Sequence, residues 1–160
     1  MIWKMCSAVT DLLISVAVMC LLAFGALLLM GFRPYVVRSG SMEPAIQAGS
    51  LCFIDSHAPY QEIQEGDIAA FRLPAGSRVV HRVIRVTEEG AETKGDANDR
   101  SDGISVFEGN YIGKAIFSVP ALGYFVAAVQ SGRGKILGIT GIVCLLISGA
   151  FLRETKVKKN

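Results

Sequence analysis

Two uncharged apolar runs frame the chain. The first, residues 12–32, has 21 residues without a charge, and the second, 136–152, has 17. At about 1.5 Å rise per residue, the first run spans about 30 Å, which is the thickness of a bilayer core. It predicts a retained transmembrane helix, because it is longer than the apolar core of a cleaved secretory signal. The second run predicts another span, with a buried core helix as its alternative.

Between these runs, short apolar stretches alternate with turn residues. Strand signals lie at 50–56, 67–73, 77–90, 91–96 and 110–117, and Gly, Pro, Ser and Asp separate them. This spacing predicts a mainly β domain, a compact antiparallel barrel or sandwich, rather than alternating strands and helices. The apolar segment 118–129 is broken by Pro120 and Gly123, so it fits either a membrane-surface segment or part of the β core.

Charge is distributed unevenly along the chain. Residues 33–118 carry nine basic and twelve acidic residues, whereas the rest of the chain carries seven basic and two acidic residues. The basic excess adjoins the apolar runs, which indicates membrane topology rather than nucleic-acid binding. The predicted parts are a cytoplasmic N-terminus, a span, an extracytoplasmic β-rich domain, a membrane-proximal segment with a turn, a second span and a basic cytoplasmic tail: 1–11, 12–32, 33–118, 119–135, 136–152 and 153–160.

The four cysteines do not form a recognisable framework. Cys6 precedes the first run, Cys20 and Cys144 lie within the two runs, and Cys52 lies in a predicted strand. This spacing predicts neither disulfides nor a zinc site, and structural burial is the expected role of each thiol.

A turn-rich loop, "RSGSMEP" at 38–44, carries the first candidate chemistry. A serine nucleophile needs exposure, an adjacent base and donors for an oxyanion. Gly40 between Ser39 and Ser41 allows the backbone to turn tightly and approach a substrate. The alternative is a juxtamembrane turn whose hydroxyls cap the backbone.

Histidine supplies the second candidate. His81 lies in "VVHRV" and, on a strand, shares a face with Val79 and Val83. A histidine on an apolar face is either a catalytic base or a hydrogen-bonded core residue. The other histidine, His57, has the setting of a surface turn.

The acidic segment "TKGDANDRSDG" supplies the third candidate, with Asp96, Asp99 and Asp102. It fits a solvated turn or a calcium site, although the EF-hand spacing is absent. A carboxylate here is also able to orient an imidazole, as in a serine–histidine–acid triad.

Four motifs occur in a fixed order: "SGSMEP", "GDIAAFR", "HRVIRV" and "TKGDANDRSD". Together they resemble the conserved boxes of type I signal peptidases over residues 33–118. The version resembled is the endoplasmic-reticulum type, which also occurs in archaea and some Gram-positive bacteria. Its base is a histidine, whereas the common bacterial type has a lysine at the position of His81.

The resemblance implies a role for each matching residue. Ser41 matches the nucleophile, and His81 matches the general base. Ser39 matches a serine whose hydroxyl joins the Ser41 backbone N–H in the oxyanion hole. Asp102 matches the catalytic acid, and Asp96 matches an aspartate that supports activity or local structure.

The acidic box departs from the family pattern in one place. The family usually reads Gly-Asp-Asn-Asn, and Ala97 stands in place of the first Asn. This departure leaves the choice between Asp102 and Asp96 as the catalytic acid open, with Asp99 a lesser candidate. Gly66 and Asp67 match a structural box.

The function implied is a membrane-bound serine endopeptidase of the plasma membrane. It removes signal peptides from exported preproteins at the outer membrane surface, after small residues at −1 and −3. The preprotein and the lipid bilayer are the partners, accessory partners remain open, and neither a metal nor a cofactor is required. Ser41 lies nine positions after Phe32, so the nucleophile lies at most ~30 Å from the end of the run.

Two other functions are weighed against this one. A catalytically silent membrane-anchored β domain that binds or assembles exported proteins has no need for Ser41, His81 and Asp102 together. A serine–lysine protease is disfavoured, because neither Lys94 nor Lys114 occupies the "HRV" position. Histidine ordinarily titrates near ~6.5 and acts as a base when neutral, so activity is expected to fall in acid.

Overall fold

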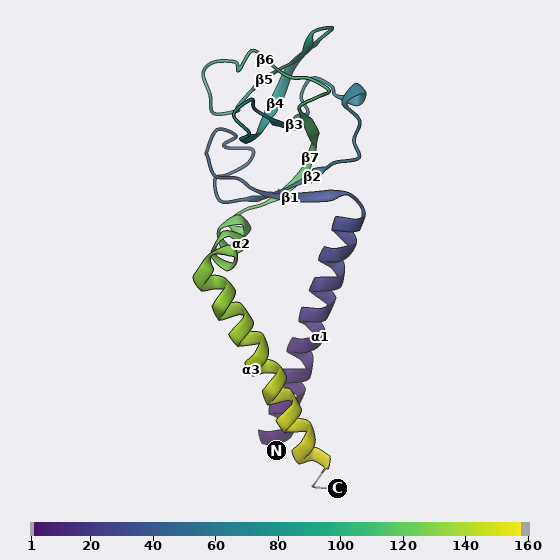
Figure 1. Cartoon of the computed structure of the whole chain (residues 1–160), viewed down its shortest axis with the longest axis vertical. Coiled ribbons are helices and arrows are strands. Elements are labelled where there is room, and N and C mark those ends of the chain that lie inside the picture. The colour runs from purple at the N-terminus through teal and green to yellow at the C-terminus, as the bar shows by residue number, and fades with distance from the viewer. Residues whose placement is uncertain (1, 158–160) are drawn as a thin grey trace. The chain divides into compact units, whose positions relative to one another are not determined.

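The computed structural model describes the backbone of residues 2–157 and the side-chain exposure of residues 8–144, 147 and 149. The chain divides into two compact units. One unit, Leu28–Ala127, contains the β sheet (Figure 1). The other consists of the helical residues on either side of it.

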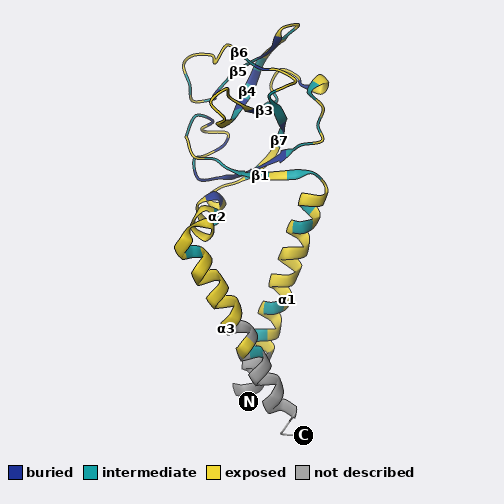
Figure 2. Cartoon of the chain, viewed as in Figure 1, coloured by how far each residue is buried: buried dark blue, intermediate teal, exposed yellow. Residues whose placement is uncertain are grey.

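Helix α1 (Ile2–Leu29) contains most of the first apolar run. Its segment Ala8–Leu29 is long and apolar enough to cross a membrane, and its most apolar part is not buried within the protein. Figure 2 shows the described part of α1 as mainly exposed. Apolar side chains that face outward all round a long helix are stable in lipid, so this segment is the membrane anchor.

The helix ends three residues before the predicted span does. Gly31 has φ +86°, and its N–H donates to the Leu28 carbonyl at 3.1 Å. Phe32 then begins the first strand. A left-handed glycine after the last turn is a common helix terminator, which explains why the apolar run and the helix have different ends.

Two helices follow the sheet, α2 (Leu122–Gln130) and α3 (Gly132–Val157). Within the described residues, neither meets the length and hydropathy of a membrane span. The predicted second span, 136–152, falls on α3, and its residues 145, 146, 148 and 150–152 lie outside those whose side chains are described. A second crossing therefore stays a prediction.

The thiols differ in their exposure. Cys52 is buried, as predicted, whereas Cys20 on α1 and Cys144 on α3 are exposed. The prediction of burial is therefore wrong for these two, because an apolar run that faces outward exposes its cysteines with its other side chains. Cys6 lies outside the residues whose side chains are described.

Seven strands form one antiparallel sheet: β1 (Phe32–Val36), β2 (Leu51–Asp55), β3 (Ile68–Arg72), β4 (Arg78–Thr87), β5 (Gly90–Lys94), β6 (Ile104–Val106) and β7 (Tyr111–Val119). A short 3-10 helix, Tyr60–Glu62, lies between β2 and β3. The strand order is β1-β2-β7-β3-β4-β5-β6. Every pair is antiparallel, and β1 and β6 are free edges, so the domain is a half-barrel rather than a closed barrel or a two-sheet sandwich.

The five predicted strands are confirmed, and the sheet contains two more, β1 and β6. The ambiguous segment 118–129 forms the end of β7 and then α2. Pro120 follows β7 and cannot donate a ladder hydrogen bond, so the strand ends there. This stretch is therefore largely helical and not part of the β core.

Alternation along β3 divides the buried core into two clusters. Ala69 and Phe71 belong to one, together with Val83 from β4, and Ala70 belongs to the other. Successive strand residues point to opposite faces, so β3 carries apolar side chains on both. Figure 2 shows buried positions concentrated in the strands. The sheet is thus a rigid support for side chains that leave its strands and loops.

Candidate active site

The loop between β1 and β2 is anchored by apolar side chains. Met42 is 1% exposed and Ile46 is 4% exposed, and both pack in the same core cluster as Cys52. Burial of Met42 restrains the backbone of its neighbour Ser41. The sequence motif therefore contains an anchor, Met42, directly beside the candidate nucleophile.

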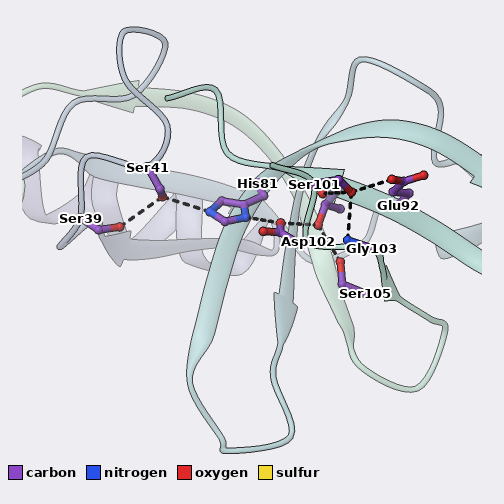
Figure 3. A network of polar contacts seen from close by, with 9 residues as sticks. Ser39, Ser41, His81, Glu92, Ser101, Asp102, Gly103 and Ser105 are labelled. Carbon is purple, nitrogen blue, oxygen red and sulfur yellow. Dashed lines mark hydrogen bonds and ion pairs between the residues drawn. The ribbon is translucent and has the colours of Figure 1, made fainter. Parts of the chain in front are cut away.

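A chain of short contacts begins at Ser41 (Figure 3). Its hydroxyl Oγ lies 3.0 Å from Nε2 of His81. On the other side of the ring, His81 Nδ1 lies 2.5 Å from Oδ2 of Asp102. The structure thus brings together three residues that lie 40 and 21 positions apart in the sequence.

His81 is held by the strands around it. It lies on β4 opposite Ala69 of β3 and is 8% exposed. The Phe71 ring contacts the imidazole edge-on, with 6.5 Å between ring centroids. Val79 and Val83 belong to the same cluster, as the period of two predicts. His81 therefore lies on an apolar strand face and is still placed to act as a base, because its ring nitrogens reach Ser41 and Asp102 beyond that face.

Asp102 precedes β6 and is fixed through both its backbone and its side chain. Its N–H donates to the Thr93 carbonyl at 2.8 Å. Its Oδ2 accepts a second hydrogen bond, 2.9 Å long, from the Thr93 hydroxyl. Thr93 Oγ1 lies 2.6 Å from the hydroxyl of Ser105. Neither Thr93 nor Ser105 was among the residues predicted from the sequence.

The other acidic candidates lie elsewhere. Both oxygens of Asp96 accept from the Arg82 guanidinium, at 2.8 and 2.7 Å, and a third Arg82 nitrogen donates to the Gly66 carbonyl at 2.8 Å. The hydrogen bond to Asp96 raises the pKa of Arg82 above its usual value. Asp99 is exposed. The acid that contacts the imidazole is thus Asp102, while Asp96 forms an ion pair.

Ser39 lies beside the candidate nucleophile. Its hydroxyl is 3.2 Å from that of Ser41, and Figure 3 shows both side chains at one end of the network. The contact is compatible with the predicted oxyanion role.

The remaining candidates have structural settings. Lys114 forms an ion pair with Asp67 at 2.6 Å. His57 is exposed, and its backbone N–H donates to the Asp55 carboxylate. In the part of the chain that the structure describes, no three His, Cys, Asp or Glu side chains gather in a way that could hold a metal ion.

This geometry allows general-base catalysis. A neutral imidazole at 3.0 Å is within range to accept the serine proton, and the carboxylate on Nδ1 fixes the tautomer that leaves Nε2 free. The same carboxylate stabilises the imidazolium that forms. The site is partly buried, which strengthens each of these interactions relative to water.

Comparison with known proteins adds an independent observation. The sequence profile of a family described as "Signal peptidase, peptidase S26" matches residues 9–97. Signal peptidase I W of Bacillus subtilis is 36% identical over 84 residues, which cover 50% of this chain and 44% of that protein. The chain therefore spans less than half the length of this relative.

Fungal relatives match over a longer stretch. The signal peptidase complex catalytic subunit SEC11 of Colletotrichum graminicola is 33% identical over 126 residues, covering 69% of this chain and 73% of that protein. The SEC11 subunit of Komagataella phaffii is 31% identical over 129 residues, with 69% and 74% covered. The similarity extends beyond the profile match into the segment that contains Asp102.

Proposed function

The chain belongs to the signal peptidase family, peptidase S26, and from this membership and the site geometry we propose that it cleaves signal peptides from exported preproteins as a membrane-anchored serine endopeptidase. Ser41 is the proposed nucleophile, His81 the general base and Asp102 the orienting acid. The observation that carries the proposal is the continuous contact from Ser41 Oγ through both ring nitrogens of His81 to Asp102 Oδ2.

Acylation follows from these contacts. His81 Nε2 takes the proton of Ser41 Oγ while this oxygen attacks the scissile carbonyl carbon. A tetrahedral oxyanion forms, and the positive charge on His81 is stabilised by Asp102. His81 then gives its proton to the leaving amine. The C–N bond breaks, and the signal peptide remains attached to Ser41 as an ester.

Deacylation repeats the same proton movements with water. His81 takes a proton from a water molecule, and the resulting hydroxide attacks the ester carbonyl. The proton returns to Ser41 Oγ as the ester bond breaks. The signal peptide leaves with a free carboxylate, and the serine is restored for another cycle.

The oxyanion is proposed to be held by two donors, the Ser41 backbone N–H and the Ser39 hydroxyl. Donors fixed before the reaction stabilise the transition state without reorganisation. The 3.2 Å contact between the two serine hydroxyls supports this placement of Ser39.

Substrate selection is proposed from the chemistry of peptide binding and from the similarity to signal peptidases. An extended peptide with small residues at −1 and −3 would add to a strand edge of the half-barrel and present alternate side chains to shallow pockets. Anchoring supplies the other part of selection. A signal peptide's apolar segment stays in the bilayer, so an enzyme held by α1 meets it at a high effective concentration.

The proposed topology places the β domain outside the plasma membrane, with the N-terminus in the cytoplasm. It includes a second crossing at 136–152, which returns the basic tail 153–160 to the cytoplasm. The positive residues of the tail support this orientation. Protease protection of sealed vesicles would test it, since only externally placed residues are digested.

The deciding experiment compares cleavage of a labelled preprotein in liposomes by the wild type, Ser41→Ala and His81→Ala. Release of mature protein by the wild type alone supports the proposal. Equal cleavage by wild type and Ser41→Ala excludes Ser41 as the nucleophile. Folded wild-type protein that cleaves no preprotein, while preproteins still bind it, favours a silent membrane-anchored scaffold.

A further inference from the structure

We propose that Thr93 and Ser105 are positioning residues of the catalytic apparatus, and that they hold the Asp102 carboxylate in the orientation His81 requires. The inference rests on the proposed function, because it assigns a purpose to the acid of the proposed triad. It adds two hydroxyls that extend the chain of contacts from Ser41 into the sheet.

The direction of each hydrogen bond can be derived. A carboxylate is an acceptor, so the Thr93 hydroxyl gives its one proton to Asp102 Oδ2, at 2.9 Å. Thr93 Oγ1 then has no proton left for Ser105. The 2.6 Å hydrogen bond between these hydroxyls therefore has Ser105 as its donor and Thr93 as its acceptor. The two hydroxyls therefore form a directed relay that ends on the carboxylate.

Both donors to Asp102 meet the same oxygen. Oδ2 accepts from His81 Nδ1 and from Thr93 Oγ1. Two donors from different strands restrict rotation of the carboxylate about its Cβ–Cγ bond. The Asp102 side chain is 27% exposed, so without Thr93 it is able to turn toward water. The hydroxyl thus keeps Oδ2 aimed at the imidazole.

Thr93 is well suited to hold a fixed donor. It is fully buried on β5, opposite Val83 of β4. Its branched side chain has few rotamers, so the hydroxyl direction is set by the strand. A buried hydroxyl without a hydrogen bond lowers the stability of the fold. A threonine at this buried position therefore indicates that the hydrogen bonds of its hydroxyl stabilise the structure.

The backbone of Asp102 is held independently of the Thr93 hydroxyl. The Asp102 N–H donates to the Thr93 carbonyl, and the Gly103 N–H donates to the hydroxyl of Ser101, which in turn donates to Glu92 (Figure 3). Substituting the Thr93 side chain leaves these bonds in place. Valine has a similar shape and suits a strand, so Thr93→Val removes the hydroxyl, and with it both the donor to Asp102 and the acceptor for Ser105, while the strand is kept.

Glu92 on β5 and Arg82 on β4 each pair with a side chain outside this relay. Glu92 accepts from Ser101 and Arg85, and those two hydrogen bonds lower the pKa of Glu92. Arg82, which lies opposite Lys94 in register, pairs with Asp96. The imidazole itself meets the Asp102 carboxylate, the Ser41 hydroxyl and the Phe71 ring. Asp102 is therefore the acidic group in contact with His81 among the described residues.

The experiment measures preprotein cleavage by the full chain in liposomes, with kcat and KM determined across pH for the wild type, Thr93→Val, Thr93→Ser and Ser105→Ala. Thr87→Val is the matched control. It removes a similar hydroxyl, whose 2.8 Å bond goes to the Gly90 carbonyl within the β4–β5 hairpin. Ser41→Ala establishes that the measured activity belongs to the proposed nucleophile.

Thr93→Val is expected to lower kcat about tenfold with KM unchanged, because a hydrogen bond to a charged group is lost from the transition state and not from substrate binding. Loss of the donor leaves more negative charge on Oδ2, so the acid limb of the pH profile moves upward by roughly half a pH unit. Ser105→Ala is expected to lower kcat about threefold, and the kcat of Thr93→Ser is expected to stay within about twofold of the wild-type value.

The inference is overturned if Thr93→Val has the same kcat and the same acid limb of the pH profile as the control Thr87→Val. It is also overturned if a loss of activity in Thr93→Val leaves the acid limb unmoved, because packing alone then accounts for it. If Thr93→Val fails to fold, Ser105→Ala decides by the same two readouts. Cleavage by Ser41→Ala at the wild-type rate would instead remove the proposed function itself.

Discussion

The backbone carbonyl of Ser41 accepts a hydrogen bond of 2.9 Å from the N–H of Ala97. This bond joins the loop that carries the proposed nucleophile to the turn at the start of the acidic box. It uses the backbone of residue 97, so the Ala97 side chain, which departs from the family pattern, does not affect it. The turn itself is closed by a 2.9 Å bond from the Asn98 N–H to the Gly95 carbonyl.

Gly95→Ala is expected to displace Ser41. A Cβ at residue 95 would lie 2.5 Å from the Ser41 carbonyl oxygen, a backbone atom that cannot move without moving the nucleophile. We expect kcat to fall at least about tenfold, because small misplacements of reacting groups are costly. Gly109→Ala is the control, since its Cβ meets no atom within 4 Å. Equal activity of the two variants would show that the loop adapts.

Asp102→Asn and Asp96→Asn are expected to differ in kind. The first substitution keeps the shape of the acid but removes the charge that fixes the histidine tautomer, so kcat should fall by roughly 10³–10⁴ with little change in melting temperature. Asp96→Asn should chiefly lower stability, since Asp96 pairs with Arg82. Measuring kcat and melting temperature for both checks this. If Asp96→Asn lost more kcat than Asp102→Asn, Asp96 would be the catalytic acid and Asp102 the structural residue.

Arg82→Gln should destabilise the domain more than Arg85→Gln. Arg82 holds Asp96 through two nitrogens and the Gly66 carbonyl through a third, and its side chain is 34% exposed. Arg85 pairs with Glu92 but is 66% exposed. We expect a loss of about 1–2 kcal/mol for the first and below about 1 kcal/mol for the second, by chemical or thermal unfolding. Similar losses would mean that the fork geometry of Arg82 adds nothing.

The sequence predicts most strands, because apolar runs bounded by turn residues are a local signal. β1 lacks this signal, since its sequence FRPYV follows the apolar run directly and contains Pro34. The proline is tolerated because β1 is an edge strand. β6 has three residues, too few to form a pattern. Whether seven strands close into a barrel depends on long-range pairing, which periodicity does not report.

In the candidate site, too, some residues have a local sequence signal and others depend on long-range pairing. Ser41 and His81 could be selected from the sequence through the resemblance of their motifs to type I signal peptidases, whereas Asp102 is one of three candidate acids in its segment. Thr93 and Ser105 could not be selected, because a hydroxyl on a strand is informative only when the register places it on a carboxylate. The two acids could not be distinguished either.

That distinction depends on strand geometry. His81 and Arg82 are neighbours on β4, and neighbours on a strand point to opposite faces. Each therefore reaches a different acid, Asp102 or Asp96, and the sequence alone does not show which acid lies on which face. The folded sheet supplies the missing information.

Cys52 provides a prediction about alkaline stability. Its side chain is fully buried on β2, and burial raises the pKa of its thiol from 9.0 to about 11. The folded state therefore keeps the proton longer than the unfolded state does. The contribution of Cys52 to stability is complete below pH 9 and is lost as the pH rises through about 11, because only the unfolded chain gains from early ionisation.

Two measurements check this in a variant with Cys6, Cys20 and Cys144 replaced by alanine. Alkylation of Cys52 by iodoacetamide at about pH 8 should be at least about tenfold slower in the folded protein than in urea, because the reactive species is the thiolate and the site is closed to the reagent. Between pH 9 and about 11 the melting temperature should fall less steeply once Cys52 is also alanine. Rapid alkylation of a folded sample under the same conditions would mean that β2 separates from its neighbours often enough to expose the core.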